Sequence, residues 1–569
     1  MNRKSSFHFL VVSVVMNLLV CSYGRSQTSP EEIATRIDEY LSILVEEGEF
    51  SGSVLFADDG EVLLSKGYGM ANIEHGVPNT PHTKFRIGSI TKQFTAMAIM
   101  MLQERGWLNV QDSICIYVPD CPRAWEAITI HHLLTHTSGI PNFTDFPDIW
   151  DFWRLPRTVG EIITLFKDRP LRFTPGVRFE YSNSGYVLLG FIIEVVTGES
   201  YEDFLEHNIF EPLGMSNSGY DHSRTILMDR AAGYARENNT LLNAIHIEMD
   251  TPHAAGALYS TVEDLFMWDQ ALYSTDLVSQ STLDAIFAPH VSLSNVPGFG
   301  DVWDYYGYGW AIGERFNRKS LDHGGSISGF QAHINRFPEE KVCIIVLSNF
   351  EFTSMGSLGE ALPTIVKDVF GPILHWALDE TEGDVAHDSA FEHDGTLNGN
   401  PIWQPKGGMV AGALQFDGVD DYVSTEFVLN PADGAFSVFA WIKGGAPGEV
   451  VLSQAGGANW LCTDTSEGNL MTEVKGTGRG DATLLSQTVI TNDNWHRIGL
   501  VWDGSHRTLY VDGIVAAEDT QTNLLGSENG LYIGTGTAME PGTFWSGLID
   551  DVRIYNQALD AEEIEALAD

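Results

Sequence analysis

The feature that most constrains the fold of this 569-residue chain is a change in sequence texture near residue 372. Before this point, helical and strand patterns are interleaved, which is typical of α/β or α+β domains. After Leu374 the chain consists of short alternating segments separated by glycine and aspartate, as in an antiparallel sandwich. One hydrophobic core rarely serves so long a chain. We therefore predict a multidomain protein, with an α/β (α+β) domain over residues 30–372 and an all-β jelly-roll sandwich over 374–569.

Local patterns support this division. Ser29-Pro30-Glu31-Glu32 combines an N-cap serine with proline at the first helical position, so a helix should begin there. Residues 52–57 and 61–65 are β-prone and flank a turn, which predicts a hairpin. Further expected elements are an apolar helix after Ser89, a helix ending near Val196 and a strand over 341–348. Strands of the sandwich are expected at 413–416, 437–442, 496–502, 508–511, 531–533 and 548–555.

The first 24 residues have the pattern of a signal peptide. Arg3 and Lys4 precede an apolar run over 7–20, and small residues follow at Ser22 and Gly24. We expect removal of residues 1–24 and a secreted, periplasmic or extracellular protein. An uncleaved anchor is an alternative, although the run is shorter than the ~20 residues of a spanning helix. A lipoprotein site at Cys21 is a further alternative. No later segment is apolar enough to cross a bilayer.

Charge and cysteine content restrict partners and compartment. A formal net charge of −45 argues against a nucleic-acid partner, because phosphate contacts need clustered Lys and Arg. Cys115 and Cys121 flank a short segment and are close enough in sequence to form a disulfide in an oxidising compartment. Cys343 lies in an apolar run and is expected to be a buried free thiol.

Ser89-Ile90-Thr91-Lys92 is the first candidate catalytic motif. Its serine and lysine lie three positions apart at the start of a helix, so both side chains project from one face. A lysine whose pKa is lowered by burial can activate the serine hydroxyl as a nucleophile. Alone, the pattern is weak, because a surface serine and lysine can produce it by chance.

Tyr181-Ser182-Asn183 is the second candidate motif. It follows a sharp turn and precedes an apolar helix, so we expect its side chains to lie exposed at a loop. A nearby lysine ammonium could lower the phenol pKa of Tyr181 and make it a general base, and then an acid for the leaving group. Asn183 could hold a substrate amide or the lysine.

His323-Gly324-Gly325, followed by Ser326, is the third candidate motif and precedes apolar strands. Its glycines would let a substrate backbone approach a strand edge. Backbone N–H groups of that strand and of Ser89 would form an oxyanion hole.

In this order, the three motifs resemble the serine β-lactamase and penicillin-binding protein superfamily, most closely its class C-like branch of esterases and D-aminopeptidases. The resemblance covers nearly all of residues 30–370 and includes the segments 85–88, 133–140 and 255–265. It implies that Ser89 forms an acyl-enzyme and that Lys92 and Tyr181 move protons. It also implies that Asn183, His323, Gly325 and Ser326 bind substrate, the last through its backbone N–H.

Two departures from the general pattern bear on the substrate. The second motif is Tyr-x-Asn and the third is His-Gly-Gly, where Lys-Thr-Gly would hold a substrate carboxylate. We therefore expect hydrolysis of an ester or amide, without a cofactor. The alternatives are a D-Ala carboxypeptidase or β-lactamase acting on peptidoglycan-related substrates, and a catalytically inactive binding protein. A metal site at His131, His132 and His136 is rejected, because no glutamate lies between the last two.

Residues 374–569 resemble a laminin G-like, concanavalin A-type jelly roll, on the segments 412–423 and 547–555. The resemblance implies binding of a glycan or a cell-surface ligand. Asp417, Asp420 and Asp550 offer oxygen ligands suited to calcium, although turn chemistry explains such residues equally well. Trp460 and Trp545 could stack on a sugar, or belong to the core.

Overall fold

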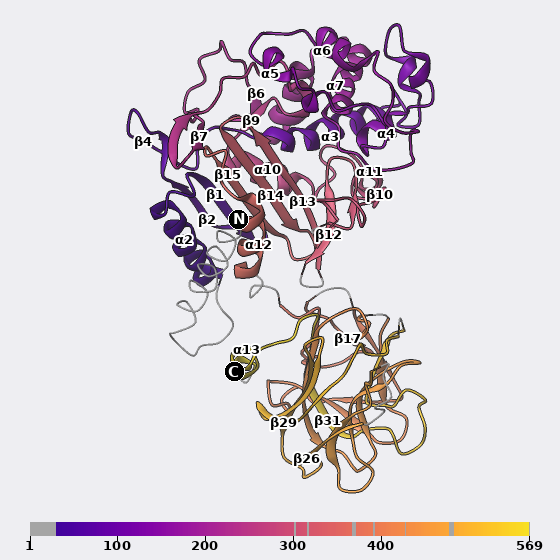
Figure 1. Ribbon diagram of the computed structural model, residues 1–569. Helices are drawn as coiled ribbons and strands as arrows, with labels where there is room; N and C mark the ends of the chain where they lie inside the picture. The colour runs from indigo at the N-terminus through magenta and orange to yellow at the C-terminus, as the bar shows by residue number, and fades with distance from the viewer. Residues whose placement is uncertain are drawn as a thin grey trace. The chain divides into compact units, whose positions relative to one another are not determined.

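The structure is a computed structural model that describes residues 30–300, 303–315, 318–366, 371–390, 393–426, 428–476, 483–527 and 529–567. The expected signal peptide, residues 1–24, lies outside the described residues. The described chain divides into two compact units on either side of residue 368, each with its own core (Figure 1). The first unit is α/β and the second is all-β, as the sequence predicted. Among the described residues, no helix is long and apolar enough to cross a membrane.

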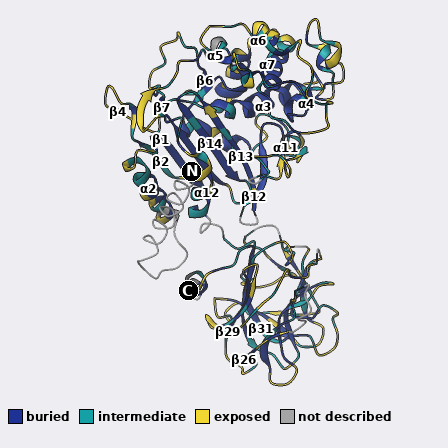
Figure 2. Ribbon diagram, viewed as in Figure 1, coloured by how far each residue is buried: buried dark blue, intermediate teal, exposed yellow. Residues whose placement is uncertain are grey.

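An eight-stranded sheet in the order β10-β11-β12-β13-β14-β15-β1-β2 organises the first unit. Its strands are β1 (Gly52–Asp58), β2 (Glu61–Tyr68), β10 (Val291–Ser292), β11 (Tyr305–Tyr306), β12 (Ala311–Arg315), β13 (Arg318–Ile327), β14 (Phe330–Phe337) and β15 (Val342–Ser348). β1 and β2 form the predicted hairpin, and β15 is the predicted apolar strand. All seven residues of β15 are buried, so both faces of the sheet are covered at its centre (Figure 2).

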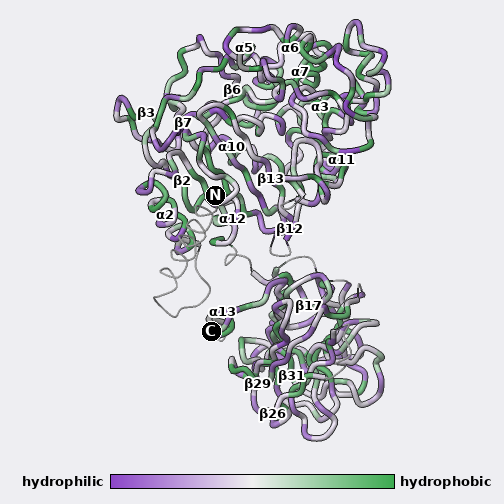
Figure 3. Tube along the Cα trace, viewed as in Figure 1, coloured by the Kyte–Doolittle hydropathy of each residue, from purple (hydrophilic) through white to green (hydrophobic). Residues whose placement is uncertain are grey.

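Helices cover the sheet and build a second layer of the unit. α2 and α12 pack together, α2 against β2 and α12 against β14, whereas α10 packs against β1 and β15. α2 covers the segment after Pro30 that was predicted to be helical, and apolar and polar residues alternate along it in Figure 3. The helices of this unit are α2 (Pro30–Glu46), α3 (Thr91–Glu104), α4 (Ile130–Leu134), α5 (Ile149–Phe152), α6 (Val159–Phe166), α7 (Asn183–Thr197), α8 (Tyr201–Leu205), α9 (Glu211–Leu213), α10 (Val262–Ala271), α11 (Gln280–Ile286) and α12 (Met355–Val366).

Three small sheets complete the first unit. They are β3 (Met70–Asn72) with β4 (Val77–Pro78), β5 (Phe85–Arg86) with β9 (Leu258–Ser260) and β6 (Gly219–Tyr220), and β7 (Tyr234–Glu237) with β8 (Thr240–Asn243). Cys115 and Cys121 form a disulfide, and Cys343 and Cys462 are buried free thiols.

Two antiparallel sheets form the second unit and enclose one core. The first, in the order β19-β20-β31-β22-β27-β28-β29 with β16 on β31, contains β16 (Leu374–Trp376), β19 (Ile402–Trp403), β20 (Leu414–Asp417), β22 (Phe436–Gly444), β27 (His496–Trp502), β28 (His506–Val511), β29 (Ile514–Thr520) and β31 (Ser546–Tyr555). The second, in the order β17-β18-β21-β30-β23-β24-β25-β26, contains β17 (Val385–Ala386), β18 (Gly395–Asn398), β21 (Tyr422–Ser424), β23 (Val450–Gln454), β24 (Asn459–Thr463), β25 (Asn469–Thr472), β26 (Leu484–Val489) and β30 (Leu531–Ile533). A short helix, α13 (Ala561–Ala566), follows β31.

Candidate active site

Ser89 lies in a 3-10 turn, η1 (Gly88–Ile90), directly before α3. The turn needs glycine before the serine, because Gly88 has a φ of +50° and an added Cβ would lie 2.9 Å from the Ser326 nitrogen. The Ser89 side chain is half-buried, and the rest of the turn is buried. The fold therefore holds one accessible hydroxyl at the start of a buried helix.

Lys92 lies one turn further along α3 and is completely buried. Its Nζ lies 3.0 Å from Ser89 Oγ, 2.8 Å from Asn183 Oδ1 and 2.8 Å from the carbonyl oxygen of Ala255. Burial lowers the pKa of Lys92 well below its ordinary value. A neutral amine has two hydrogens and one lone pair, and two of the three neighbours only accept hydrogen bonds. The lone pair of neutral Lys92 then faces the Ser89 hydroxyl.

Asn183 is the first residue of α7, and its side chain fixes Lys92. Its Oδ1 accepts from Lys92, and its Nδ2 donates to Thr144 Oγ1 at 3.1 Å, which sets the orientation of the amide. The backbone N–H of Asn183 donates to Asn142 Oδ1 at 3.0 Å. Of the two roles expected for Asn183, the structure supports the contact with the lysine. Asn142 and Thr144 were not found from the sequence, because neither belongs to a catalytic motif.

Tyr181 packs beside Lys92, but the expectation that its phenol pKa is lowered is wrong. Lys92 Nζ lies 4.8 Å from the centroid of the Tyr181 ring, over its face. Burial raises the pKa of Tyr181, and a hydrogen bond with Ser89 opposes this only in part. The expectation of an exposed loop is also wrong, since Tyr181 is half-buried and Ser182 is buried. The arrangement suits Tyr181 as a proton donor.

The third motif lies on β13, which packs directly against the Ser89 turn. A Cβ added to Gly325 would lie 1.9 Å from the Ile87 carbonyl oxygen and 3.1 Å from the Ser89 nitrogen. The Gly325 backbone is therefore in contact with the nucleophile segment, and this contact requires glycine there. An added Cβ on Gly324 would meet nothing closer than 3.9 Å. Ser326 follows Gly325, so its backbone N–H lies next to the Ser89 turn.

His323 is buried, and hydrogen bonds engage both of its ring nitrogens. Nε2 lies 3.0 Å from the Tyr306 hydroxyl, and Nδ1 lies 2.7 Å from the Gly324 carbonyl oxygen. Burial lowers the pKa of His323 to about 4. At neutral pH this residue is uncharged, and its ring nitrogens have internal partners.

His131, His132 and His136, which the sequence analysis rejected as metal ligands, have separate hydrogen-bond partners. α4 ends at Leu134, and His136 lies beyond it with a φ of +57°, so His132 and His136 do not share a helix face. His131 Nδ1 contacts the Tyr308 hydroxyl, and His132 Nδ1 accepts from the Thr129 N–H. In the described chain, none of the three belongs to a group of side chains that could hold a metal ion.

Comparison with protein families agrees with this geometry. The family model for beta-lactamase matches residues 37–361, more than half of the chain. The chain belongs to the beta-lactamase family. A second model, for the concanavalin A-like lectin/glucanases superfamily, matches residues 417–565.

This beta-lactamase family member is similar to several penicillin-binding proteins. A penicillin-binding protein of Bacillus subtilis is 32% identical over 325 residues, which are 54% of this chain and 70% of the relative. The solved structure of a penicillin-binding protein from Bacillus halodurans is 30% identical, with a TM-score of 0.50, and the match covers 56% of this chain and 98% of that one. A D-amino acid amidase from Ochrobactrum anthropi, at 24% identity and a TM-score of 0.51 over 59% of this chain and 98% of its own, shares the fold.

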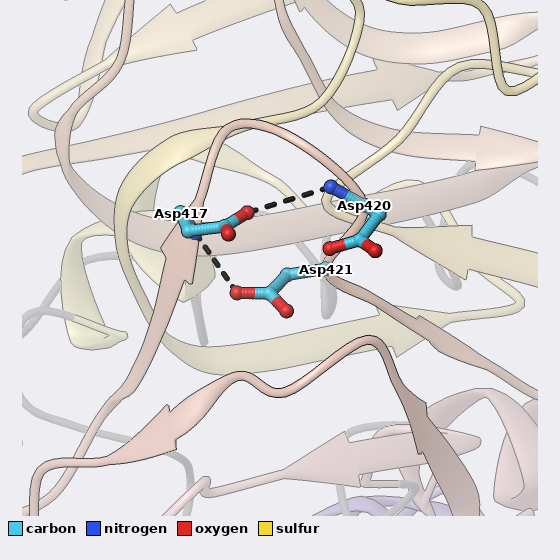
Figure 4. A group of neighbouring side chains, drawn as sticks. All are labelled: Asp417, Asp420 and Asp421. Atoms are coloured by element: carbon cyan, nitrogen blue, oxygen red, sulfur yellow. Dashed lines mark hydrogen bonds between the residues drawn. The ribbon is translucent and has the colours of Figure 1, made fainter.

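In the concanavalin A-like unit of this beta-lactamase family member, the structure groups Asp417 and Asp420 with Asp421, not with Asp550 (Figure 4). The three carboxylates lie within 4.8 Å of one another, but backbone N–H groups already use several of their oxygens. Asp421 accepts from the N–H groups of Asn400 and Asp417. Asp550 is buried elsewhere and accepts from the N–H groups of residues 409 and 410. Burial raises the pKa of Asp550 to about 7.

The ligand-binding aromatics suggested by the sequence are core residues. Trp460 and Trp545 are both completely buried, so neither can stack on a sugar. A shallow recess of about 510 Å³ lies elsewhere on this unit, lined by the small or polar residues Asn430, Ala432, Gly456, Gly526, Ser527 and Asn529. The buried Gln454 amide donates to carbonyl oxygens of residues 429, 527 and 529, and so joins the loops around the recess.

Proposed function

We propose that this protein hydrolyses an ester or amide through an acyl intermediate on Ser89. The observation that carries the proposal is the position of Lys92, whose buried Nζ lies between two acceptors and faces the Ser89 hydroxyl at 3.0 Å. A lysine whose pKa is lowered by burial, at hydrogen-bond distance from a serine, has the arrangement required of a general base.

In the proposed reaction, Ser89 Oγ forms a bond to the substrate carbonyl carbon as its proton passes to Lys92 Nζ. The backbone N–H groups of Ser89 and Ser326 stabilise the oxyanion. The bond to the leaving group then breaks, and Tyr181, whose raised pKa keeps the phenol protonated, supplies the leaving group with a proton. Tyr181 is reprotonated from Lys92, and water releases the acyl group by the reverse sequence of proton transfers.

An uncharged ester or amide fits the site better than a substrate that needs a carboxylate contact. The residue at the position of the usual lysine is His323, which is uncharged and bonded internally through both ring nitrogens. The preferred substrates are short acyl esters and D-amino-acid amides or peptides. A D-Ala carboxypeptidase or β-lactamase activity on peptidoglycan-related compounds is the second candidate, supported by the similarity to penicillin-binding proteins.

The second unit supplies binding in this proposal, and the protein acts outside the cytoplasm. The disulfide between Cys115 and Cys121 suits a secreted or periplasmic protein. The neutral, polar recess around Asn430 and Asn529 is the proposed contact for a glycan or cell-surface ligand. Calcium, if this unit binds it, is proposed at Asp417, Asp420 and Asp421, with Asp550 left out of the site.

Initial rates with a chromogenic acetyl ester, a D-amino-acid amide and a penicillin test the proposal, with Ser89→Ala as the matched variant. Hydrolysis by the wild type that is lost in Ser89→Ala is the expected result, with the penicillin as the poorest substrate. Equal rates in the two proteins would remove Ser89 as the nucleophile. A wild type that cleaves none of the three, and that a fluorophosphonate does not label, would favour an inactive binding protein.

A further inference from the structure

The Tyr306 hydroxyl lies between two buried histidines that adjoin the catalytic motifs. His136 Nε2 lies 3.3 Å from it, and His323 Nε2 lies 3.0 Å from it. Tyr306 lies in β11, and both histidines belong to other parts of the chain. All three side chains are at least 90% buried, so the contacts are shielded from water.

The hydrogens of this network can be assigned because both of its ends are backbone groups. The Ser182 N–H, which can only donate, lies 3.1 Å from His136 Nδ1, so the His136 proton is on Nε2 and points to Tyr306. At the other end, the Gly324 carbonyl oxygen, which can only accept, lies 2.7 Å from His323 Nδ1. The His323 proton is therefore on Nδ1, and Nε2 accepts from the Tyr306 hydroxyl. All four hydrogen bonds then point in one direction, with both histidines uncharged.

We propose that Tyr306 is a positioning residue, whose hydroxyl joins the Tyr181–Asn183 segment to the His323–Ser326 strand and fixes their separation. Through His136, Tyr306 orients the backbone of Ser182, between the proton donor and the residue that holds Lys92. The His136 ring also packs on Tyr181, with centroids 4.3 Å apart. Through His323, Tyr306 also orients β13, the strand that carries the Ser326 N–H. This inference rests on the proposed function, since it concerns the same reaction.

Tyr308, two residues along, offers a matched control. It is a buried tyrosine whose hydroxyl also bonds a histidine, since it lies 2.8 Å from His131 Nδ1. Its ring stacks on His290 with centroids 4.1 Å apart, and neither His131 nor His290 belongs to the three motifs. Tyr306→Phe and Tyr308→Phe each remove one buried hydroxyl, so a general loss of stability should affect both alike.

The test measures kcat and KM on an acetyl ester, the rate of Ser89 labelling by a fluorophosphonate, and the Tm of wild type and both variants. We expect Tyr306→Phe to lower kcat and the labelling rate by roughly 10-fold or more with KM within about 2-fold, because reacting groups displaced by a fraction of an ångström react more slowly. In Tyr308→Phe, kcat, KM and the labelling rate should each stay within about 2-fold of the wild-type values. In a His323→Ala background, Tyr306→Phe should cost less activity than it does in the wild type, because one of its two contacts with a histidine is already broken.

The possible outcomes distinguish failure of the inference from failure of the proposed function. Equal losses in Tyr306→Phe and Tyr308→Phe, or a Tyr306→Phe loss as large in the His323→Ala background as in the wild type, would overturn the positioning role and leave the reaction untouched. A loss of activity in Tyr306→Phe that its decrease in Tm explains completely would also overturn the positioning role. A wild type that neither hydrolyses the ester nor reacts with the fluorophosphonate would overturn the proposed function and the positioning role together.

Discussion

Gly325→Ala tests whether the third motif serves chiefly to bring β13 against the nucleophile. The new Cβ would lie 1.9 Å from the Ile87 carbonyl oxygen, whereas carbon–oxygen contacts are ordinarily about 3.3 Å or longer. One of the two backbone segments must therefore move by roughly 1.4 Å. Neither contact partner is a flexible side-chain end, so the strain falls on the strand or on the turn that carries Ser89.

The expected magnitude follows from that displacement. Overpacking of this kind costs about 1–3 kcal/mol, which is a decrease in Tm of a few degrees for a unit of this size. A shift of the reacting group by about 1 Å costs about 10²-fold in rate. We expect Gly325→Ala to lower kcat/KM on an acetyl ester by about 100-fold, with a modest decrease in Tm.

Gly324→Ala is the matched control, because its Cβ would meet nothing closer than 3.9 Å and its φ is not positive. Its kcat/KM should remain within about 3-fold of wild type. If Gly325→Ala has wild-type activity and Tm, or if the two variants lose activity equally, the contact between Gly325 and Ile87 does not control the site.

Three further predictions concern ionisable side chains. If neutral Lys92 is the base, kcat/KM on an ester should rise with pH as Lys92 loses its proton, at a pH well below the ordinary lysine pKa. In Lys92→Arg, where the side chain stays charged, kcat/KM should fall by about 10²- to 10⁴-fold. Activity like that of the wild type in this variant would contradict the assignment. The folded-state pKa of Asp550 is raised to about 7, so the folded second unit holds a proton that the unfolded chain releases near pH 4. The stability of the second unit should therefore fall as pH rises from 4 to 7. The Tm of Asp550→Asn should depend less on pH over that range, and a pH dependence of Tm equal to that of the wild type would refute the argument. If Asp417, Asp420 and Asp421 bind calcium, the Tm of the wild type should be higher in millimolar CaCl₂ than in EGTA. The Tm of Asp420→Asn should not respond to calcium. Equal wild-type Tm values with and without the ion would mean that the three carboxylates only stabilise the turn.

The sequence predicted the parts of the site that depend on short-range geometry. The spacing of Ser89 and Lys92 on one helix determines their contact, so it could be predicted without knowledge of the rest of the fold. The β1–β2 hairpin and six strands of the sandwich (β20, β22, β27, β28, β30 and β31) were predicted for the same reason, since alternation and turn residues are local signals.

Features that depend on burial or on distant segments were predicted poorly. The pKa of Tyr181 was assigned in the wrong direction because the sequence shows a neighbouring lysine but not the loss of water around the phenol. His136 was considered only as a metal ligand and Tyr306 was not considered, because their contact joins residues 170 positions apart. Asp550 was grouped with Asp417 by residue type, although the fold places Asp421 there instead.

The position of β1 inside the sheet, between β15 and the edge strand β2, has a consequence for how the chain is made. β1 pairs with β15, and the hydroxyl of Ser348 bonds the carbonyl oxygen of Ser51, 297 residues away. The first unit cannot complete its sheet until almost all of its residues have been synthesised, and contacts between such distant segments form slowly. The nascent first unit therefore has exposed strand edges for most of its synthesis, and such unpaired edges are prone to aggregation.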